Sequence, residues 1–291
     1  MLSTPLSQFT RAVADLRSRP IVIKFGGSVQ DDPAQTAAII DDLATLARMG
    51  LRPIVVHGGG KAITAALAAA GLQSRFVAGQ RYTDGKTLRV AERVLCGQVN
   101  ADICRLLTDR GVPAASLTSL SGCALTASRT SAQDAEGHPL DLGLVGQVEA
   151  VRTDLLMALC NAGTVPVLAP IAMDLDETSE VGRLNVNADL AAGMVARAIK
   201  PHAFILVSDT PGIRTIATDP SSCAKRLTTA DIARLKASKV IDGGMLPKVD
   251  ACLMALDAGV SHVAICDGRV PGATVASLLA SDFPGTILAA E

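Results

Sequence analysis

Uninterrupted runs of apolar residues recur along this chain, and each is followed by glycine or a short polar turn. Such runs are typical of strands buried on both faces of a parallel sheet. They lie at 21–25, 53–57, 165–171, 202–208, 262–266 and 285–288. Helical spacing of apolar residues marks the segments between them, at 33–50, 61–70, 87–110, 154–162, 188–199, 229–238 and up to about 258. The repeated order of strand, turn and helix predicts an α/β fold with a parallel sheet, whose ligand site lies at the carboxyl ends of the strands.

Other segments depart from this alternation. Apolar residues at three- and four-residue spacing predict an amphipathic helix over 3–18, either as an extra packed helix or as an oligomer contact. Residues 112–150 alternate short apolar pieces with turn residues, which predicts a hairpin or meander that leaves the main sheet and forms a lid or wall. Residues 214–228 read as a loop.

The first apolar run contains a lysine and ends in a glycine turn, as Lys24-Phe25-Gly26-Gly27-Ser28. A glycine turn between a strand and a helix exposes backbone N–H groups, which favours phosphate binding. A lysine in such a strand is costly to bury unless it meets an anion. Either Lys24 faces a phosphate, or it lies at the sheet edge and reaches water.

A second glycine turn follows the next strand, as His57-Gly58-Gly59-Gly60. Three consecutive glycines allow a ligand to approach the backbone closely. Two such turns on neighbouring strands are a stronger indication of an anion site than one.

The segment Gly79–Thr87 ends like a Walker A motif but lacks its spacing and a buried strand before it. Thr83 or Asp84 instead suits the N-cap of the following helix. Arg81, just before that helix, is either a bidentate clamp for a carboxylate or a solvated surface residue. Asp189, at the entry of the 188–199 helix, is either a dipole or capping partner at the N-terminus of that helix or a catalytic orienting group.

Composition excludes several classes of protein. Hydrophobic residues make up 49% of the chain, yet no apolar run approaches the ~20 residues that span a membrane, and the N-terminus lacks the apolar core of a signal peptide. A net charge of −1 and 2% aromatic residues argue against a nucleic-acid surface. The seven cysteines show no C-x-x-C spacing and the four histidines are dispersed, which predicts free thiols, a cytoplasmic location and no metal site built from histidine. No G-x-G-x-x-G follows any strand, which argues against a dinucleotide-dependent dehydrogenase.

Five motifs in order make the chain resemble the amino acid kinase family, over about residues 20–288. They are the two glycine turns, Asn185-Val186-Asn187-Ala188-Asp189, Ser208-Asp209-Thr210-Pro211-Gly212 and Gly243-Gly244-Met245-Leu246-Pro247-Lys248. The segments Arg81–Asp84 and Asp267–Pro271 are most similar to members that act on N-acetylglutamate. The resemblance implies a three-layer αβα sandwich around an open, mainly parallel central sheet. It also implies transfer of the γ-phosphoryl group of ATP, with Mg²⁺ carried by the nucleotide, to the side-chain carboxylate of N-acetylglutamate in arginine biosynthesis.

The resemblance also implies roles for individual residues. Lys24 and Lys248 stabilise the transition state, and Asp189 orients them. Substrate binding falls to Gly59, Gly60, Arg81 and Asn185. Nucleotide binding falls to Gly26, Gly27, Ser208, Asp209, Gly212, Ile213, Ile241, Asp242 and Gly243. Residues 1–19 form a helical extension, 20–182 the lobe that binds the acid and 183–291 the lobe that binds ATP, within one continuous domain.

Some alternatives stay open at this point. A kinase of the same family acting on an acetylated or carrier-linked aminoadipate needs the same residues, and a non-catalytic amino-acid sensor can share the fold. The run Ser121–Leu125 departs from the family pattern of the local hairpin, and Ser281–Thr286 departs from that of many arginine-inhibited members. The resemblance implies a homo-oligomer, a dimer or a hexamer.

Overall fold

The fold was analysed in a computed structural model, which describes residues 10, 13–26, 32–133, 136–280 and 282–291. Most of the predicted helix over 3–18 therefore lies outside the described residues. The predicted nucleotide ligand Gly27 lies wholly outside them. Val13 and Leu16, which are described, are buried. No helix within the described ranges is long and apolar enough to cross a membrane.

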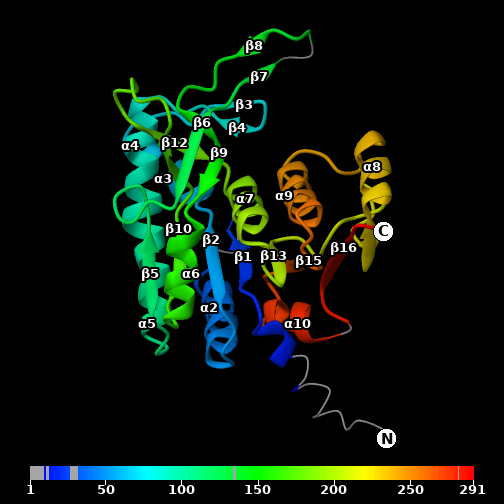
Figure 1. Cartoon of the computed structure of the whole chain (residues 1–291). Helices are drawn as coiled ribbons and strands as arrows, with labels where there is room; N and C mark the ends of the chain where they lie inside the picture. Colours follow the sequence, from blue (N-terminus) through cyan, green and yellow to red (C-terminus); the bar gives the residue numbers. More distant parts are fainter. Residues whose placement is uncertain (1–9, 11–12, 27–31, 134–135, 281) are drawn as a thin grey trace, which may run out of the picture.

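A central sheet of eight strands runs through the molecule (Figure 1). Its order is β14 (Arg226–Thr228), β16 (Gly285–Ala289), β15 (His262–Asp267), β13 (Ala203–Ser208), β1 (Ile21–Phe25), β2 (Pro53–His57), β10 (Val165–Leu168) and β5 (Ala114–Leu117). All neighbouring pairs are parallel except β15 and β16. The predicted open, mainly parallel sheet is confirmed.

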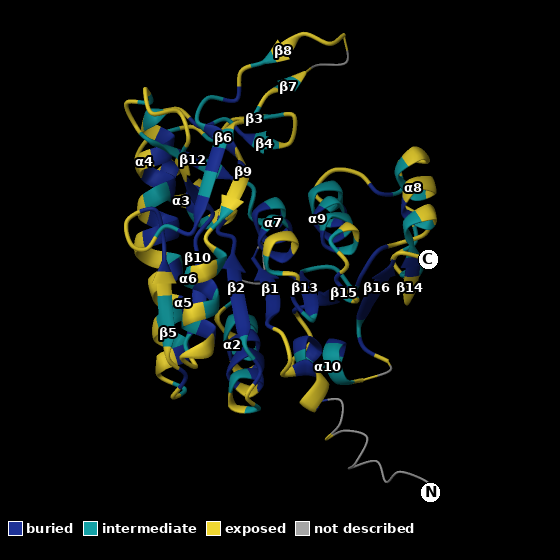
Figure 2. Cartoon of the chain, in the orientation of Figure 1, coloured by how far each residue is buried: buried dark blue, intermediate teal, exposed yellow. Residues whose placement is uncertain are grey.

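Helices cover both faces of this sheet, which gives the three predicted layers (Figure 2). One face packs against α2 (Pro33–Arg48), α5 (Asn100–Thr108) and α10 (Ala273–Leu279). The other packs against α6 (Thr153–Asn161), α7 (Ala188–Ile199), α8 (Thr229–Ala237) and α9 (Met245–Asp257). Successive strand residues point to opposite faces, so in β1 Ile21, Ile23 and Phe25 join the first core and Val22 joins the second.

A smaller β structure stands beside the carboxyl edge of the sheet. Four strands close on one another: β6 (Leu125–Arg129), β9 (Val145–Val151), β12 (Arg183–Val186) and β11 (Ile171–Asp174). Two hairpins accompany them: β3 (Phe76–Val77) with β4 (Gln80–Arg81), and β7 (Ala132–Gln133) with β8 (Pro139–Leu140). The remaining helices are α3 (Gly60–Ala69) and α4 (Gly85–Val94), the latter continuing through a π-helical turn, η2 (Leu95–Val99), into α5.

Several sequence expectations need correction. The segment 112–150 does not leave the main sheet entirely, because its first strand, β5, is the edge strand of that sheet and pairs with β10. Only its later strands, β6 to β9, belong to the separate β structure. The run 165–171 is two strands, since Ala169 and Pro170 break the pairing before β11. The predicted loop 214–228 contains β14. The predicted cap of the helix after Arg81 is confirmed, because the Asp84 carboxylate accepts a hydrogen bond from the Thr87 N–H.

Candidate active site

The period of β1 decides where Lys24 points. Side chains along a strand alternate between the two faces of the sheet. Lys24 is two residues after Val22, so its side chain lies on the same face as that of Val22, which α7 and α9 cover. β1 is a central strand, with β13 on one side and β2 on the other. Lys24 is only 5% exposed, so the alternative of a lysine reaching water at the sheet edge is wrong.

Helix α7 brings a carboxylate to this lysine. Asn187 is the N-cap, and its side-chain oxygen accepts hydrogen bonds from the N–H groups of Asp189 and Leu190. Capping by Asn187 frees Asp189, in the first turn, to point at the sheet. Asp189 is therefore not the cap of α7, although it lies in the first turn, where the helix dipole favours a negative charge.

Helix α9 brings the second lysine, and a close helix crossing sets its place. A Cβ added at Gly193 of α7 would lie 2.8 Å from the Cα of Ala251 of α9, so the two backbones nearly touch there. Asp189 is about one turn before this crossing on its helix, and Lys248 is about one turn before it on the other. The crossing thus places both side chains at the N-terminal ends of the two helices, beside Lys24.

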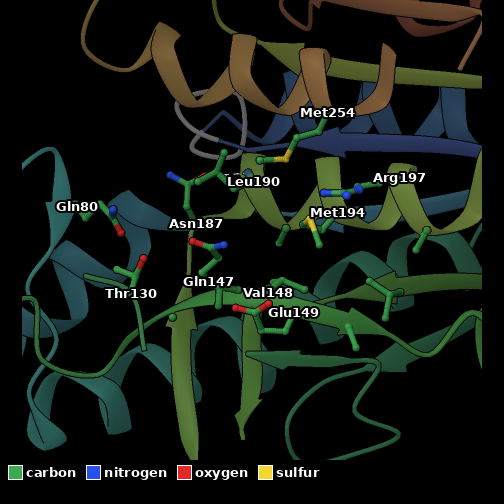
Figure 3. A pocket seen from close by; sticks show the side chains of 16 residues that line it. Gln80, Thr130, Gln147, Val148, Glu149, Asn187, Leu190, Met194, Arg197 and Met254 are labelled. Atoms are coloured by element: carbon green, nitrogen blue, oxygen red, sulfur yellow. Dashed lines mark hydrogen bonds between the residues drawn. The ribbon is translucent and has the colours of Figure 1, made fainter. Parts of the chain in front are cut away.

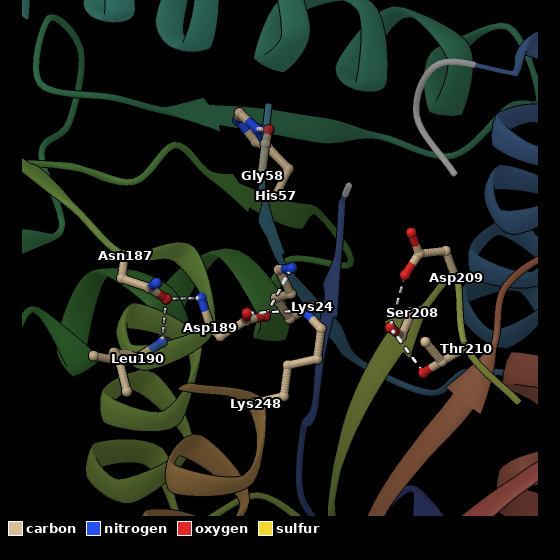
Figure 4. A network of polar contacts seen from close by, with 10 residues as sticks. All are labelled: Lys24, His57, Gly58, Asn187, Asp189, Leu190, Ser208, Asp209, Thr210 and Lys248. Atoms are coloured by element: carbon tan, nitrogen blue, oxygen red, sulfur yellow. Dashed lines mark hydrogen bonds and ion pairs between the residues drawn. The ribbon is translucent and has the colours of Figure 1, made fainter. Parts of the chain in front are cut away.

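The three charged groups form one cluster (Figure 4). Lys24 Nζ lies 2.7 Å from Asp189 Oδ1, an ion pair, and Lys248 Nζ donates a hydrogen bond of 2.9 Å to Asp189 Oδ2. Burial lowers the pKa of Lys24, although the Asp189 charge opposes that effect. Burial would raise the pKa of Asp189, but the two ammonium groups together outweigh it and lower that pKa. One carboxylate thus stays ionised between two cations, which fixes their positions.

The two glycine turns touch each other beside this cluster. A Cβ added at Gly26 would lie 2.9 Å from the backbone of Gly58 and 3.3 Å from Lys24 Nζ. Gly58 is held to β1 by a hydrogen bond of 2.9 Å from its N–H to the Phe25 carbonyl. Any side chain at Gly26 would push the turns apart, which explains why glycine suits this position.

Arg81 is buried, at 8% exposure, so the alternative of a solvated arginine is wrong. Its Nη2 donates to the Gly60 carbonyl at 2.8 Å and to Thr64 Oγ1 at 2.9 Å, and its Nη1 donates to the Ser74 hydroxyl. The Phe76 ring lies over the guanidinium, 4.9 Å from its central carbon. The guanidinium is therefore held in place beside the second glycine turn.

A cavity of about 280 Å³ connects these groups. Lys24, Gly59, Gly60, Arg81, Asn185, Asp189 and Lys248 line it, so the structure brings the predicted catalytic and substrate-binding residues together. Asn185 also donates a hydrogen bond of 3.2 Å to Thr83 Oγ1. Sequence reasoning missed the wall made by Ile63, Phe76, Gly79, Gln80, Leu95, Val145 and Pro170. Gly79, between Phe76 and Gln80, was the available signal, because glycine marks a turn.

The predicted nucleotide ligands between Ser208 and Gly243 lie outside this cavity. Ser208 is the last residue of β13, the strand next to β1, and Asp209 follows it. Both residues lie to the side of Lys24, at the carboxyl ends of these strands (Figure 4). The Ile213 N–H donates to Thr286 Oγ1 at 2.9 Å, which ties the loop that contains Gly212 to β16. Ile241 is buried, and the exposed residues Asp242 and Gly243 form the turn that leads into α9. None of these residues lines the cavity that holds the two lysines.

A second cavity of about 600 Å³ lies between β9 and α7 (Figure 3). Leu190, Met194 and Met254 give it an apolar side, and Glu149 and Arg197 lie on its polar side. It shares only Gln80, Val186 and Asn187 with the smaller cavity and contains none of the three clustered charges. Its larger size therefore does not make it the site of the chemistry.

Comparison with known proteins agrees with the family indicated by the motifs. The sequence profile of the "Amino acid kinase family" matches residues 19–267. The chain is 37% identical over 268 residues to the acetylglutamate kinase of Methanothrix thermoacetophila, covering 92% of this chain and 91% of that protein. It is 36% identical over 277 residues to the acetylglutamate kinase of Symbiobacterium thermophilum, covering 95% and 93%.

Solved structures share the fold at lower identity. An N-acetylglutamate synthase from Neisseria gonorrhoeae, complexed with coenzyme A and N-acetyl-glutamate, superimposes with a TM-score of 0.81 at 21% identity. The match covers 99% of this chain but 64% of that one, so the present chain spans less than two thirds of the synthase. Isopentenyl phosphate kinase superimposes with a TM-score of 0.62 at 18% identity, covering 92% of this chain and 99% of that one. Its motifs, its three-layer αβα sandwich and these matches show that the chain belongs to the amino acid kinase family.

Proposed function

We propose that the protein phosphorylates the side-chain carboxylate of N-acetyl-L-glutamate with ATP and releases N-acetyl-L-glutamyl 5-phosphate, a step of arginine biosynthesis. The observation that carries this proposal is the pair of lysines held on Asp189 at one side of a cavity that also contains Arg81. The relatives named acetylglutamate kinase, matched along almost the whole chain, support the same substrate.

The reaction brings two anions together, and the charged cluster suits that task. An oxygen of the substrate carboxylate attacks the γ-phosphorus of ATP, the bond from that phosphorus to the β,γ-bridging oxygen breaks, and ADP leaves with those electrons. No proton has to move. Lys24 and Lys248 neutralise the charge that spreads over the transferring group, while Asp189 keeps them in place.

Residues on the other side of the cavity suit the rest of the acid. Arg81 is proposed to bind the α-carboxylate, because its guanidinium is fixed against Gly60 and Thr64. Asn185 is proposed to bind the N-acetylamino group. The apolar wall that includes Ile63, Leu95 and Val145 suits the methylene chain.

The nucleotide is proposed to bind at the same sheet edge, on the other side of Lys24. Gly26 and Gly27 are proposed to donate N–H groups to its phosphates, and the residues from Ser208 to Ile213 and Ile241 to Gly243 to border it. Residues 20–182 would then form the lobe for the acid and 183–291 the lobe for ATP. Mg²⁺ would be held through the ATP phosphates and would supply further positive charge there. The described part of the chain contains no cluster of three or more His, Cys, Asp or Glu side chains that could hold a metal ion.

We also propose a cytoplasmic homo-oligomer, dimeric or hexameric. The family resemblance supports the homo-oligomer. The scattered cysteines, all seven of which are free, support the cytoplasmic location. Size measurement of the full chain and of a chain lacking residues 1–18 tests whether the N-terminal segment is the assembly contact.

A coupled assay of ADP formation tests the proposed reaction. We expect ADP to form with ATP, Mg²⁺ and N-acetylglutamate, and Lys248→Ala to reduce kcat at least about 10²-fold. Wild-type turnover in that variant would contradict the assigned role of Lys248. Preferential turnover of N-acetyl-aminoadipate in a substrate panel would redirect the proposal to a related kinase, and nucleotide binding without turnover of any acid would favour a sensor.

A further inference from the structure

Two fully buried polar side chains stand behind the second glycine turn. His57 ends β2, and Asn100 opens α5, and each has an exposure of 0%. His57 Nδ1 lies 2.8 Å from the Gly58 carbonyl oxygen, and His57 Nε2 lies 3.1 Å from Asn100 Nδ2. Asn100 Nδ2 also donates to the Val167 carbonyl of β10 at 2.9 Å. Buried polar groups need hydrogen-bond partners of this kind. These hydrogen bonds also have a defined donor and acceptor at each contact.

The partners fix which atom carries each proton. The carbonyl oxygens of Gly58 and Val167 can only accept, so His57 Nδ1 and Asn100 Nδ2 must donate to them. His57 Nε2 then accepts from Asn100, as a neutral imidazole requires. Burial lowers the pKa of His57 to about 4, and the nearby charge of Lys24 acts in the same direction, so the ring is neutral at pH 7.

The π-helical turn η2 leads directly into Asn100. A π-turn widens a helix and is often found at functional sites. Its first residue, Leu95, packs against the glycine turn so closely that a Cβ added at Gly59 would lie 2.6 Å from Leu95 Cδ2. Asn100 comes directly after the turn and contacts His57. The wide turn, the amide and the imidazole thus form one support behind Gly58 and Gly59.

This support sets the orientation of one peptide group. No described residue has a cis peptide bond. In a trans peptide the carbonyl and the N–H point in opposite directions, so the Gly58 carbonyl directed at the imidazole turns the Gly59 N–H away from it. Gly58, Gly59 and Lys24 all line the same cavity. Gly59 is also the N-cap of α3, where N–H groups lack partners within the helix.

We propose that His57 and Asn100 are positioning residues, which hold the peptide between Gly58 and Gly59 so that the Gly59 N–H faces the phosphoryl group in transfer. This inference rests on the proposed function. A hydrogen-bond donor aimed at charge that develops in the transition state accelerates the chemical step and contributes little to ground-state binding. A support needed only for folding would instead affect stability and the binding of both substrates.

The test compares two substitutions at His57. His57→Phe keeps a flat ring but removes the donor, whereas His57→Asn retains an amide N–H close to the place of Nδ1–H. We expect kcat of His57→Phe to fall about 10²-fold with both KM values within about twofold of wild type. Affinity for ADP with aluminium fluoride, which mimics the planar phosphoryl group, should fall by about the same factor in the presence of N-acetylglutamate. His57→Asn should recover at least about tenfold of the lost kcat.

His262→Phe is a matched control, because it makes the same change in a largely buried histidine at the opposite end of a strand of the same sheet. It should keep wild-type kcat. Asn100→Ser shortens the support from the side away from the cavity and should lower kcat about tenfold at unchanged KM, so it carries the test if His57→Phe does not fold.

The possible outcomes separate this inference from the proposed function. If the wild type transfers no phosphoryl group to N-acetylglutamate, the proposed function fails. If the wild type is active and His57→Phe keeps its kcat, or if His57→Phe and His57→Asn lose kcat equally, only the positioning role is overturned. An increase in KM at unchanged kcat, or unchanged affinity for the aluminium fluoride complex, would overturn it as well.

Discussion

The strand that carries Lys24 and the helix that carries Lys248 hold their ammonium groups in different ways. Lys24 extends from a central strand with hydrogen-bonded neighbours on both sides, and its side chain is 6% exposed. Lys248 extends from the first turn of α9, and its side chain is 19% exposed. Both contact the same carboxylate, so Asp189 joins a rigid sheet to a helix that is fixed mainly by its packing on α7.

The difference indicates how the two lysines can be disturbed. The position of Lys24 depends on the register of β1, which cannot change by one residue without turning the whole strand over. The position of Lys248 depends on how closely α7 and α9 approach at Gly193 and Ala251. A variant that moves the helices should therefore affect Lys248 and leave Lys24 in place.

Asp189→Asn should have the largest effect, because it removes the charge that the two lysines share. Lys24 would remain buried without its ion-pair partner, and the loss of one partner costs about 3–5 kcal/mol in other buried pairs. We expect a loss of that order in the free energy of unfolding, measured by urea denaturation, and a fall in kcat of at least about 10²-fold. Asp282→Asn, at an exposed ion pair with Lys225, provides a control that should leave kcat and stability unchanged. Stability equal to wild type would contradict the structural role of Asp189.

Gly193→Ala should have a smaller effect, confined to the helical side of the comparison. The new methyl group would lie 2.8 Å from the Ala251 Cα, so α7 and α9 must move apart. We expect a loss of about 1–3 kcal/mol in stability and a fall of about tenfold in kcat, because Lys248 is displaced.

Gly85→Ala is the matched control, since a methyl group at that glycine, at the start of α4, meets only Arg89 Nη1 at an ordinary contact distance of 3.7 Å. A crystal structure of Gly193→Ala should show a longer distance from Lys248 Nζ to Asp189 and an unchanged one from Lys24 Nζ. Equal displacement of both lysines would contradict the inference that β1 holds Lys24 independently of the helix packing that holds Lys248.

The sequence predicted the sheet side of this site better than its surroundings. Unbroken apolar runs located β1, β2 and β13, and the parity of Lys24 along β1 follows from the strand period alone. The choice of Asp189 as the shared partner came from the resemblance, because an aspartate at the start of a helix can instead serve only as a dipole or capping partner. The structure resolves that ambiguity through Asn187, which caps the helix instead.

Other parts could not be read from local patterns. The hairpin of β3 and β4 has two-residue strands, too short for any periodicity, although it carries Arg81 and the Phe76 ring above it. The π-turn from Leu95 to Val99 lies in a segment with ordinary helical spacing, so sequence reasoning treated 87–110 as one regular helix. Both features depend on contacts with distant residues. The roles of Ser208 to Gly243 in nucleotide binding stay predictions.

The pH dependence of kcat should distinguish the two lysines, with the smallest of the three effects. Burial lowers the pKa of Lys24 from 10.5, while Asp189 and Asp209 oppose this and Lys248 adds to it. The protonated ammonium is the active form, so kcat should be level at neutral pH and fall as the pH rises through this lowered pKa, below about 10.5. In Lys24→Arg the guanidinium keeps its charge, so the alkaline fall should move to higher pH in whatever activity remains. Lys248→Arg should leave the fall where it is. A shift in Lys248→Arg but not in Lys24→Arg would assign the titrating group to the helix and reverse the comparison.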